Sequence, residues 1–421
     1  MVLTWILILV FGVTMPTLLV LIGSGNAPIS SVLVLNAGVV AFCLMSLNMM
    51  LATRAKPIEI LVSGLDRIYV LHKQIGYAIF ACILVHVFIG IELDGKILAQ
   101  GLAQLAVEIA EFVYPILLVL LALSVLKRVP FIRREVVKYQ WWRLGHRFIG
   151  VLFAAICLHQ LFVKVPFTTS AMAGQYLNGM AILGLASYVY SQLLMPMRRK
   201  KYIVENVTKH PSATIIRAKP FGAKAKVAPG NFAVISFRKS GLREPHPFTV
   251  SKAEHDGTVE FSVKALGDYT HDLKEKISAG DTMDLQGGYG RFDFRQGEDT
   301  QVWLAGGIGI TPFLAFADSL CADETRKILL IYCVTTRDEA LSLDRLTAAQ
   351  DRCAGFQFHL YVSTDNGRFD ADKLVDLVPF DLRKAGFWFC GPAPMRAAML
   401  AGLTRKKHAP HSVHYEQFEF R

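Results

Sequence analysis

The chain has 421 residues, of which 53% are hydrophobic and 19% are charged, and its mean hydropathy is +0.38. Soluble domains are less apolar and carry about 25% charged residues, so the composition predicts a membrane-embedded part joined to an ordinary globular part. The apolar content excludes a disordered chain, and the lack of a glycine repeat excludes a collagen-like one. The net charge of +11 would suggest nucleic-acid binding in a soluble protein, so its distribution has to be considered first.

Six apolar stretches, each close to the roughly 20 residues that a membrane-spanning helix needs, precede residue 200. They cover residues 2–23, 30–52, 69–91, 109–126, 148–166 and 174–195. The first stretch has no basic segment before its apolar run and is too long for a signal peptide, so we predict a retained helix. The first half is therefore predicted to be a six-helix transmembrane bundle.

The charges around these stretches predict which side of the membrane each link faces. Lys and Arg cluster between the second and third spans, between the fourth and fifth spans, and directly after the sixth. The opposite links contain only Lys96 and Lys164 as basic residues. By the positive-inside rule, both termini and the polar second half are predicted to face the cytoplasm, in a multi-pass protein of the cell membrane. This topology accounts for much of the net charge, and nucleic acid is not expected as a partner.

The seven cysteines are scattered along the chain and include no C-x-x-C pair. Zinc–thiolate sites and cysteine-ligated iron–sulfur clusters are therefore not expected, and neither is a fused plant-type ferredoxin. Unpaired cysteines fit a reducing compartment for the polar half, and they predict no disulfide framework.

Four histidines stand apart, because all of them lie on the third and fifth predicted spans, with His146 two residues before the apolar stretch of the fifth begins. His72 and His86 are fourteen residues apart on the third span, and His146 and His159 are thirteen apart on the fifth. At a rise of about 1.5 Å per residue, each pair is separated by roughly 20 Å along its helix. We therefore expect His72 to lie level with His146 near the inner face, and His86 to lie level with His159 near the outer face.

Two facing imidazoles at each level suit two haems with bis-histidine ligation, which would form an electron path across the membrane. Thirteen residues end about 140° around an ideal helix, so the fifth helix would need curvature, a π-bulge or supercoiling to present both rings. The alternatives are histidines that hydrogen-bond neighbouring groups, and a proton relay or metal transporter. A relay is disfavoured because the middle of these two spans carries no carboxylates.

From residue 202 onward the composition becomes ordinary. Short alternating runs with Gly and Pro between them predict a small antiparallel barrel, at residues 213–219, 232–238, 258–266 and 282–286. Strands then alternate with helices, which predicts a parallel doubly wound α/β sheet with strands at 301–305, 328–334, 356–362 and 387–390. We predict three domains: the transmembrane bundle over 1–200, the β-barrel over 201–297 and the α/β domain over 298–421.

Two loops of the predicted α/β domain have the form of ligand-binding loops. One contains Gly306, Gly307, Gly309, Thr311 and Pro312, and it follows a strand and opens a helix. Glycines allow the backbone to approach a phosphate closely, although purely structural glycines are the alternative. The other loop, Cys390-Gly391-Pro392, ends the fourth strand at the carboxyl edge, where ligands bind in such sheets.

Three further segments have both a functional and an ordinary interpretation. The run His246-Pro247-Phe248-Thr249-Val250-Ser251 suits the edge of a flat ring or an ordinary strand start. The run Gly267-Asp268-Tyr269-Thr270 opens a predicted helix and suits a phosphate or a simple turn and cap. Phe418 and Phe420, at the end of the sequence, suit packing on an edge strand or the cover of a flavin.

Taken together, these residues resemble the NADPH oxidase and ferric reductase superfamily, most closely its compact bacterial members without regulatory extensions. The first half is similar to the ferric-reductase-type transmembrane domain, and the second half is similar to a ferredoxin–NADP reductase module. The resemblance covers essentially the whole chain. It implies an oxidoreductase with an FAD-binding barrel, an NAD(P)H-binding α/β domain and two b-type haems.

The resemblance also implies a role for each motif. The haem ligands would be His72, His86, His146 and His159. The flavin segment would be His246, Pro247, Phe248 and Thr249, with Ser251 after it, and the FAD pyrophosphate site would comprise Gly267, Asp268 and Thr270. The pyridine-nucleotide loop would comprise Gly306, Gly307, Gly309, Thr311 and Pro312. The nicotinamide would face Cys390, Gly391 and Pro392, and the flavin would be covered by Phe418, which we prefer to Phe420.

Two positions depart from the pattern of the family. His246 stands where many relatives have an arginine, so one contact to an FAD phosphate would have to come from elsewhere. Gly90 stands one turn after the outer histidine of the third span, where some oxidases carry another histidine. This second departure leaves open how the outer haem would handle oxygen.

The resulting hypothesis is electron transfer from cytoplasmic NADPH through FAD and the two haems to an extracytoplasmic small molecule. Oxygen, giving superoxide, is the first choice of acceptor. Reduction of a ferric chelate and electron donation to an extracytoplasmic protein are the alternatives, although the sequence requires no protein partner. A transporter or channel with a nucleotide-sensing domain is the rival from another class.

The choice of nucleotide depends on the residues after the second strand of the α/β domain. The end of this strand faces the adenosine ribose in doubly wound sheets. Arg337 stands there, and an arginine can pair with a 2′-phosphate through charge-assisted hydrogen bonds. This predicts NADPH as the preferred nucleotide and NADH as the second. Asp338 follows directly and makes the signal mixed, and a solvated turn is the alternative.

Overall fold

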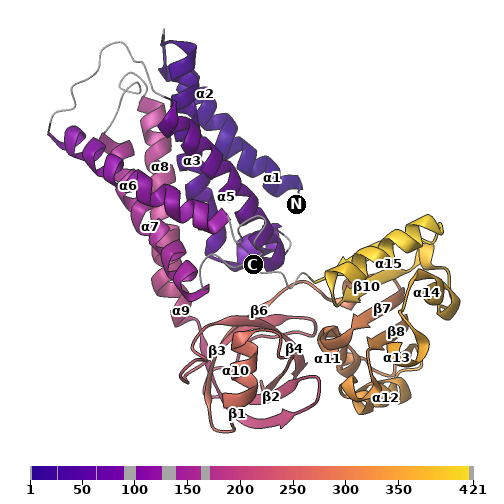
Figure 1. The fold of residues 1–421 in the computed structure, drawn as a ribbon. Coiled ribbons are helices and arrows are strands. Elements are labelled where there is room, and N and C mark those ends of the chain that lie inside the picture. Colours follow the sequence, from indigo (N-terminus) through magenta and orange to yellow (C-terminus); the bar gives the residue numbers. More distant parts are fainter. Residues whose placement is uncertain are drawn as a thin grey trace. The chain divides into compact units, whose positions relative to one another are not determined.

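The computed structural model describes residues 2–25, 27–62, 64–89, 101–125, 139–162 and 171–416. It divides into two compact units, Met1–Met197 and Arg198–Arg421. The first unit is helical, and the second contains a barrel and an α/β lobe (Figure 1).

The first unit contains six helices long and apolar enough to cross a membrane, counted over the described residues. The first span comprises α1 (Val2–Leu9), the π-helical turn η1 (Val10–Thr14) and α2 (Met15–Gly23). The other spans are α3 (Ile29–Ala52), α5 (Leu65–Phe88), α6 (Leu102–Val125) and α7 (Tyr139–Phe162), and then α8 (Ala171–Val189) continued by η3 (Tyr190–Leu194) and α9 (Met195–Met197). The short α4 (Lys56–Val62) precedes α5. This arrangement confirms the predicted six-helix bundle.

Helix α3 forms the centre of this unit, because it packs closely on both α5 and α8. A glycine allows part of this packing: a Cβ at Gly184 would lie 2.6 Å from the Phe153 ring and 3.2 Å from the backbone of Ser46. Phe153 in turn stacks on Phe42 of α3, with ring centroids 5.3 Å apart. Helix α6 packs on α7, whereas α5 and α7 have few close backbone approaches. The contacts between α5 and α7 are therefore made mainly by side chains.

Six antiparallel strands of the second unit close into a barrel in the order β1-β2-β5-β4-β3-β6. They are β1 (Lys200–Lys209), β2 (Thr214–Pro220), β3 (Phe232–Phe237), β4 (His246–Ala253), β5 (Val259–Val263) and β6 (Thr282–Tyr289), and α10 (Asp268–Lys276) lies between the last two. The sequence did not predict β1, because of its ten residues only Tyr202 and Val204 are buried. Apart from this strand, the predicted antiparallel barrel is confirmed.

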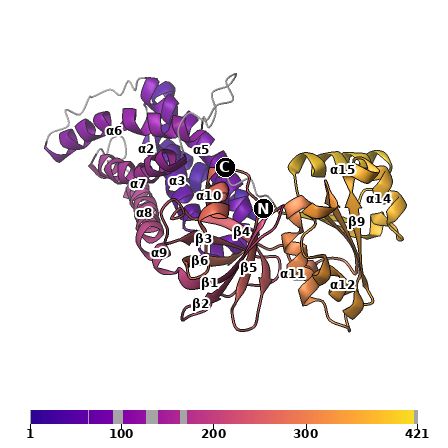
Figure 2. The same cartoon turned by 60° about the horizontal axis from the view of Figure 1, so that its bottom comes forward.

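The α/β lobe has five parallel strands in the order β11-β10-β7-β8-β9. They are β7 (Thr300–Gly306), β8 (Lys327–Val334), β9 (Phe356–Val362), β10 (Gly386–Cys390) and the short edge strand β11 (Ser412–Tyr415), which was not predicted. One face of the sheet is covered by α11 (Thr311–Ser319) and α12 (Leu343–Arg352), and the other by α14 (Ala371–Leu377) and α15 (Ala393–Arg405) (Figures 1 and 2). This is the predicted doubly wound sheet.

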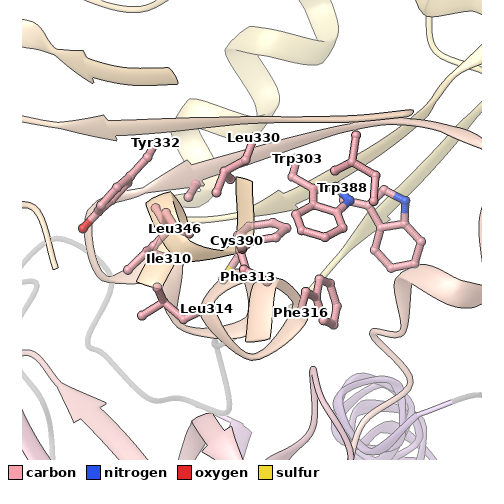
Figure 3. Close-up of a cluster of buried hydrophobic side chains, with 14 of the residues drawn as sticks. Trp303, Ile310, Phe313, Leu314, Phe316, Leu330, Tyr332, Leu346, Trp388 and Cys390 are labelled. Atoms are coloured by element: carbon pink, nitrogen blue, oxygen red, sulfur yellow. The ribbon is translucent and has the colours of Figure 1, made fainter. Parts of the chain in front are cut away.

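The barrel and the α/β lobe share a hydrophobic core within the second unit. Phe292 and Phe294, from the segment after β6, belong to the same buried cluster as Trp303 and Phe316 of the lobe. Figure 3 shows part of this cluster, with Trp303, Phe313, Phe316 and Trp388 grouped around α11. Gly230, in the loop before β3, is required here, because its φ is +79° and a Cβ would lie 2.5 Å from the Phe316 ring. The two lobes are therefore packed together as one body.

Candidate functional site

The strand order of the α/β lobe creates a place for a ligand at its carboxyl edge. Strands β7 and β10 are neighbours, although β8, β9 and several helices lie between them along the chain, and Ala305 pairs with Cys390 in register. Their following connections leave toward opposite faces of the sheet, through α11 and α15. Such a switch point is where open α/β sheets bind ligands. The two loops predicted from the sequence are the two loops that meet there.

These two loops are pressed against one another, and their glycines are what allows it. A Cβ at Gly309 would lie 2.1 Å from the carbonyl oxygen of Cys390, and a Cβ at Gly306 would lie 3.0 Å from the ring of Pro392. Gly307 differs, because its φ is +56° and a Cβ would meet nothing within 4 Å. Gly306 and Gly309 thus serve loop packing, whereas Gly307 faces open space where a ligand could approach.

The glycine loop forms a short 3-10 helix, η5 (Gly307–Ile310), before α11 begins at Thr311. Thr311 and Pro312 are both buried in the first turn of α11. Proline is favoured at this position because the missing N–H would have no partner inside the helix. The structure therefore shows these two residues fixing the start of the helix that follows the loop.

Three polar side chains from distant parts of the second unit converge beside the loop of β10. Thr249 of β4 donates a hydrogen bond to Glu416, with 3.4 Å between Oγ1 and Oε2. Cys390 is fully buried, and burial together with the carboxylate of Glu416 raises the pKa of its thiol well above the usual range. The thiol is therefore protonated at neutral pH, and its surroundings are largely apolar (Figure 3).

Glu416 was missed by the sequence analysis. The signal that could have identified it is its position directly after β11, at the same carboxyl edge as Cys390. The predicted aromatic residues Phe418 and Phe420 follow it, but they lie outside the described residues.

The two barrel segments singled out in the sequence lie together. The ring of His246, at the start of β4, packs on the ring of Tyr269 in the first turn of α10, with centroids 3.8 Å apart. The ring centroid of Phe248 lies 6.4 Å from that of His246. Burial, with Glu244 nearby, raises the pKa of the Tyr269 hydroxyl. Pro247 pairs with Val234 of β3 and so holds the segment in the barrel wall.

The turn before α10 is closed by Thr270. Its Oγ1 accepts hydrogen bonds from the backbone N–H groups of Leu266 at 2.8 Å and Gly267 at 3.0 Å, and it donates one to the carbonyl of Gly267. The first N–H groups of any helix have no partner within that helix, so they can receive an anion. Asp268 occupies the first position of α10 and is exposed.

Ser251 and Arg337 lie apart from these groups. Ser251 is fully buried, and its Oγ donates to Glu260 of β5 at 3.1 Å. Arg337 is exposed in the 3-10 helix η6 (Arg337–Glu339), which follows β8 directly. Among the described residues no ion pair engages Arg337, and Asp338 beside it is also exposed. The guanidinium is thus presented to solvent at the carboxyl edge of the sheet.

In the membrane unit, three of the four histidines have the same pattern of hydrogen bonding. The Nδ1 of His72 lies 3.2 Å from the carbonyl of Asn48, and the Nδ1 of His86 lies 3.0 Å from the carbonyl of Val34, both on α3. The Nδ1 of His146 lies 3.1 Å from the hydroxyl of Ser124 on α6. In each case the partner comes from the neighbouring helix that packs on the histidine's own helix.

The inner two histidines lie level with one another, as the sequence predicted. The rings of His72 and His146 face one another with centroids 5.8 Å apart and an angle of 68° between their planes. His86 and His159 lie close enough to interact electrostatically. Gly38 of α3 makes room for the outer pair, because a Cβ there would lie 2.5 Å from the Nδ1 of His86. Helix α7 is α-helical without interruption from Tyr139 to Phe162, so of the three adjustments considered for it, curvature, a π-bulge or supercoiling, the π-bulge is absent.

In the part of the chain that the structure describes, no three His, Cys, Asp or Glu side chains gather as a metal site built by protein alone would require. A haem has a different requirement, because the porphyrin supplies the equatorial nitrogens and the protein supplies only axial ligands. A pair of imidazoles at each level is therefore sufficient.

Comparison with known proteins finds three family matches, one in the first unit and two in the second. Residues 37–157 match the family described as "ferric reductase like transmembrane component", residues 203–305 match "FAD-binding domain", and residues 303–400 match "oxidoreductase NAD-binding domain". Dual oxidase 2 of Sus scrofa is 26% identical over 320 residues, which are 70% of this chain and 20% of that protein. These three matched domains, in this order, match the NADPH oxidase and ferric reductase superfamily, and Dual oxidase 2 is a homologue of this chain.

Other similar proteins cover different shares of the chain. The electron transfer component of 2-halobenzoate 1,2-dioxygenase from Burkholderia cepacia is 25% identical over 205 residues, which are 47% of this chain and 60% of that protein. The chain thus spans less than two thirds of the curated relatives that it matches. The flavohemoglobin of Malassezia yamatoensis, solved with FAD and haem, is 17% identical, with a TM-score of 0.50 over 92% of this chain and 98% of that one. This last likeness shows the fold alone.

The family matches establish a membrane-bound oxidoreductase with FAD-binding and NAD-binding domains.

Proposed function

We propose that the protein is a transmembrane flavocytochrome b, which moves electrons from cytoplasmic NADPH to an acceptor on the opposite side of the membrane. It would use FAD and two b-type haems, and oxygen, giving superoxide, would be the acceptor. The observation that carries this proposal is the pairing of His72 with His146 and of His86 with His159 between α5 and α7.

The hydrogen bonding of three of the four histidines fits axial ligation. A neutral imidazole binds a metal through one nitrogen while the other donates a hydrogen bond, which fixes the tautomer and the orientation of the ring. Backbone carbonyls accept at the Nδ1 of His72 and His86, and an oxygen of Ser124 faces that of His146. In each of these rings Nε2 would therefore be the nitrogen left for ligation, and the haems would be held by His72 with His146 and by His86 with His159.

The second unit fits a flavin and a pyridine nucleotide in the same way. FAD would lie along His246, Pro247, Phe248 and Thr249, with its pyrophosphate at the turn of Gly267, Asp268 and Thr270. NADPH would lie along the glycine loop and Cys390-Gly391-Pro392, with Arg337 at its 2′-phosphate. When bound, FAD accepts a hydride and releases single electrons, and a bis-histidine haem passes single electrons on.

The residues between the two nucleotide sites would keep this region dry and ordered. The protonated thiol of Cys390 adds no negative charge that would oppose an arriving hydride. Glu416 accepts the hydrogen bond of Thr249, so the hydroxyl group of β4 is held in one orientation. The hydroxyl of Ser251, on the same strand β4, donates to Glu260 of β5 and so ties these two strands together.

The proposal is tested on the purified full-length chain. A reduced spectrum of low-spin b-type haem at two haems per chain is expected, together with NADPH oxidation and superoxide-dismutase-sensitive reduction of cytochrome c. A folded protein that binds FAD but shows no Soret band would contradict the haem assignment and favour a transporter with a nucleotide-sensing domain.

Ferric reduction is the second candidate function, because residues 37–157 match a ferric-reductase-type component. Ferric-chelate reduction that is insensitive to superoxide dismutase and persists without oxygen would favour this activity. A requirement for an added extracytoplasmic protein would instead indicate electron donation to a partner. Sidedness is tested separately, by protease digestion of sealed inside-out vesicles, which should release the second unit if it faces the cytoplasm.

A further inference from the structure

The candidate hydride-transfer region is assembled across the two lobes of the second unit. Thr249 belongs to the barrel, whereas Cys390 and Glu416 belong to the α/β lobe or follow its last strand. The Thr249–Glu416 hydrogen bond is direct evidence that groups from both lobes meet. The geometry of this region therefore depends on how the lobes are registered on one another.

One side chain ties the lobes together next to this region. Arg345, on α12, donates from Nη2 to the backbone carbonyl of Ser251 at 2.6 Å and from Nη1 to Oε1 of Glu260 at 2.9 Å. Ser251 lies on β4 and Glu260 on β5, so both acceptors belong to the barrel. On the lobe side, Asp318 of α11 accepts from Nη2 at 2.6 Å and from Nε at 3.3 Å.

This cluster of Arg345, Asp318, Glu260 and Ser251 is well shielded. The side chains of Arg345 and Glu260 are 16% and 17% exposed, and that of Asp318 is 27% exposed. Ser251 adds an internal link, because its hydroxyl donates to the same Oε1 of Glu260 that Arg345 contacts. A planar guanidinium that makes several directed bonds fixes an orientation, which a lysine ammonium does not.

We infer that Arg345 is a positioning residue, which registers the nucleotide lobe on β4 so that the nicotinamide and flavin sites face one another. Its acceptor, the carbonyl of Ser251, lies two residues after Thr249 on the same strand. A displacement of about 1 Å between reacting groups can cost about 10²-fold in rate. This inference rests on the proposed function, because it requires hydride transfer between the two sites.

Loss of the Arg345 bonds should leave the unit folded. The shared aromatic core, with Phe316 packed against Gly230, still joins the lobes. A second polar contact, from the hydroxyl of Ser212 to the carbonyl of Glu339 at 2.9 Å, lies elsewhere along the boundary. Removing Arg345 thus alters the register of the lobes while the cores stay packed.

The test uses the full-length protein in lipid nanodiscs and compares Arg345→Met with Arg352→Met. Arg352 lies on the same helix and also makes two hydrogen bonds, to the carbonyls of Leu320 and Ala317 at 2.8 Å, but these stay within the lobe. FAD content, the rate of NADPH oxidation in anaerobic rapid mixing and the rate of flavin reoxidation by ferricyanide are measured for both variants.

For Arg345→Met we expect hydride transfer to slow by about tenfold or more, with FAD content and ferricyanide reoxidation at the wild-type level. The primary isotope effect with 4-deuterated NADPH should increase, and Arg345→Lys should recover only part of the rate, since an ammonium cannot make all four bonds. Glu260→Gln removes a charge from the barrel side of this cluster, and it should lower the rate of hydride transfer without changing FAD content. Arg352→Met should leave hydride transfer unchanged.

Equal hydride-transfer rates in Arg345→Met and wild type would overturn the inference. So would a parallel loss of FAD binding and of ferricyanide reoxidation, since that result indicates a role in folding alone. A wild-type chain that binds FAD but does not oxidise NADPH would overturn the proposed function itself, and the two failures are thereby distinguished.

Discussion

The two units hold their functional side chains by different means. In the membrane unit, each of His72, His86 and His146 is oriented by one hydrogen bond between its Nδ1 and an oxygen of an adjacent helix. In the second unit, the functional loops are pressed together, so that Gly309 leaves no space for a Cβ beside the carbonyl of Cys390. The first arrangement is modular, because one ligand can be lost while the others stay in place. The second is cooperative, because a change in one loop must displace the other.

The largest effect that tests this comparison is the loss of a single haem ligand. Because the two histidine pairs use separate partners, His86→Ala should leave about one haem per chain in place of two, with the inner site intact. Electron transfer to the extracytoplasmic acceptor should be abolished, while NADPH reduction of a soluble dye continues. Haem content is measured by pyridine haemochrome assay and spectra of the reduced protein.

His255→Ala is the matched control for this experiment, because that residue is an exposed histidine of the barrel unit. It should retain both haems. Loss of both haems in His86→Ala would show that the two sites are coupled, and the membrane unit would then not be modular.

The second prediction concerns the cooperative unit. In Gly309→Ala the new methyl group would stand 2.1 Å from a backbone oxygen, so the loop of Cys390 has to move. Overpacking of this kind costs about 1–3 kcal/mol, and NADPH oxidation should be lost as the two loops separate. The haem spectrum should be unchanged, because the membrane unit holds its histidines independently. Thermal release of FAD fluorescence measures the stability of the second unit.

Gly307→Ala is the matched control for the stability measurement, and it does not serve as a control for NADPH oxidation. It also introduces a Cβ, but into open space, so its cost is limited to the strain of φ at +56°, about 1–2 kcal/mol. If Gly309→Ala proves no less stable than Gly307→Ala and still oxidises NADPH, the loops are not interlocked as the structure indicates.

The third prediction tests whether a close glycine contact, like the one between the loops of the second unit, also constrains a side chain in the membrane unit. Gly38→Ala places a methyl group 2.5 Å from the Nδ1 of His86, the atom that faces the carbonyl of Val34. The ring can rotate away, so we expect a shifted reduction potential and partial loss of the outer haem, with the inner haem unaffected. Redox titration followed by absorbance measures both potentials. Gly179→Ala, where a Cβ meets nothing within 4 Å, should change neither.

The sequence predicted what depends on local pattern. Apolar length identified six spans, alternation identified most of the barrel, and strand–helix rhythm identified the doubly wound sheet. The positions of His72, His146 and the glycine loop were predicted because helix pitch and strand ends place them with little dependence on the rest of the chain.

What the sequence did not predict depends on distant partners. The carbonyls of Asn48 and Val34 carry no side-chain signature, so nothing in the sequence marks them as partners of histidines. Glu416 and Arg345 look like ordinary surface charges until the fold brings them to Thr249 and Ser251. Strand β11 was too short and too exposed to be recognised. The roles of Phe418 and Phe420 stay predictions, since both residues lie outside the described part of the chain.

The smallest expected effect concerns Arg337, which belongs to neither kind of arrangement. It is exposed at the end of β8, and within the described part of the chain no ion pair holds it, so it can turn toward a ligand without breaking such a pair. A partly exposed charge-assisted hydrogen bond to a 2′-phosphate contributes about 1–2 kcal/mol, or roughly tenfold in binding. Arg337→Ala should therefore raise the KM for NADPH about tenfold, leave kcat within about twofold, and leave the KM for NADH unchanged.

Two further variants sharpen this last prediction. Arg383→Ala removes an exposed arginine of the same lobe that pairs with Asp381 at 2.9 Å, so it controls for the loss of positive charge and should not alter the preference. Asp338→Asn removes the carboxylate next to Arg337, which repels a 2′-phosphate, so it should lower the KM for NADPH. Steady-state kinetics with both nucleotides, at two salt concentrations, measure the preference. An equal rise of both KM values in Arg337→Ala would mean that the guanidinium contacts the pyrophosphate shared by NADPH and NADH, and the basis of nucleotide selection would then lie elsewhere in the lobe.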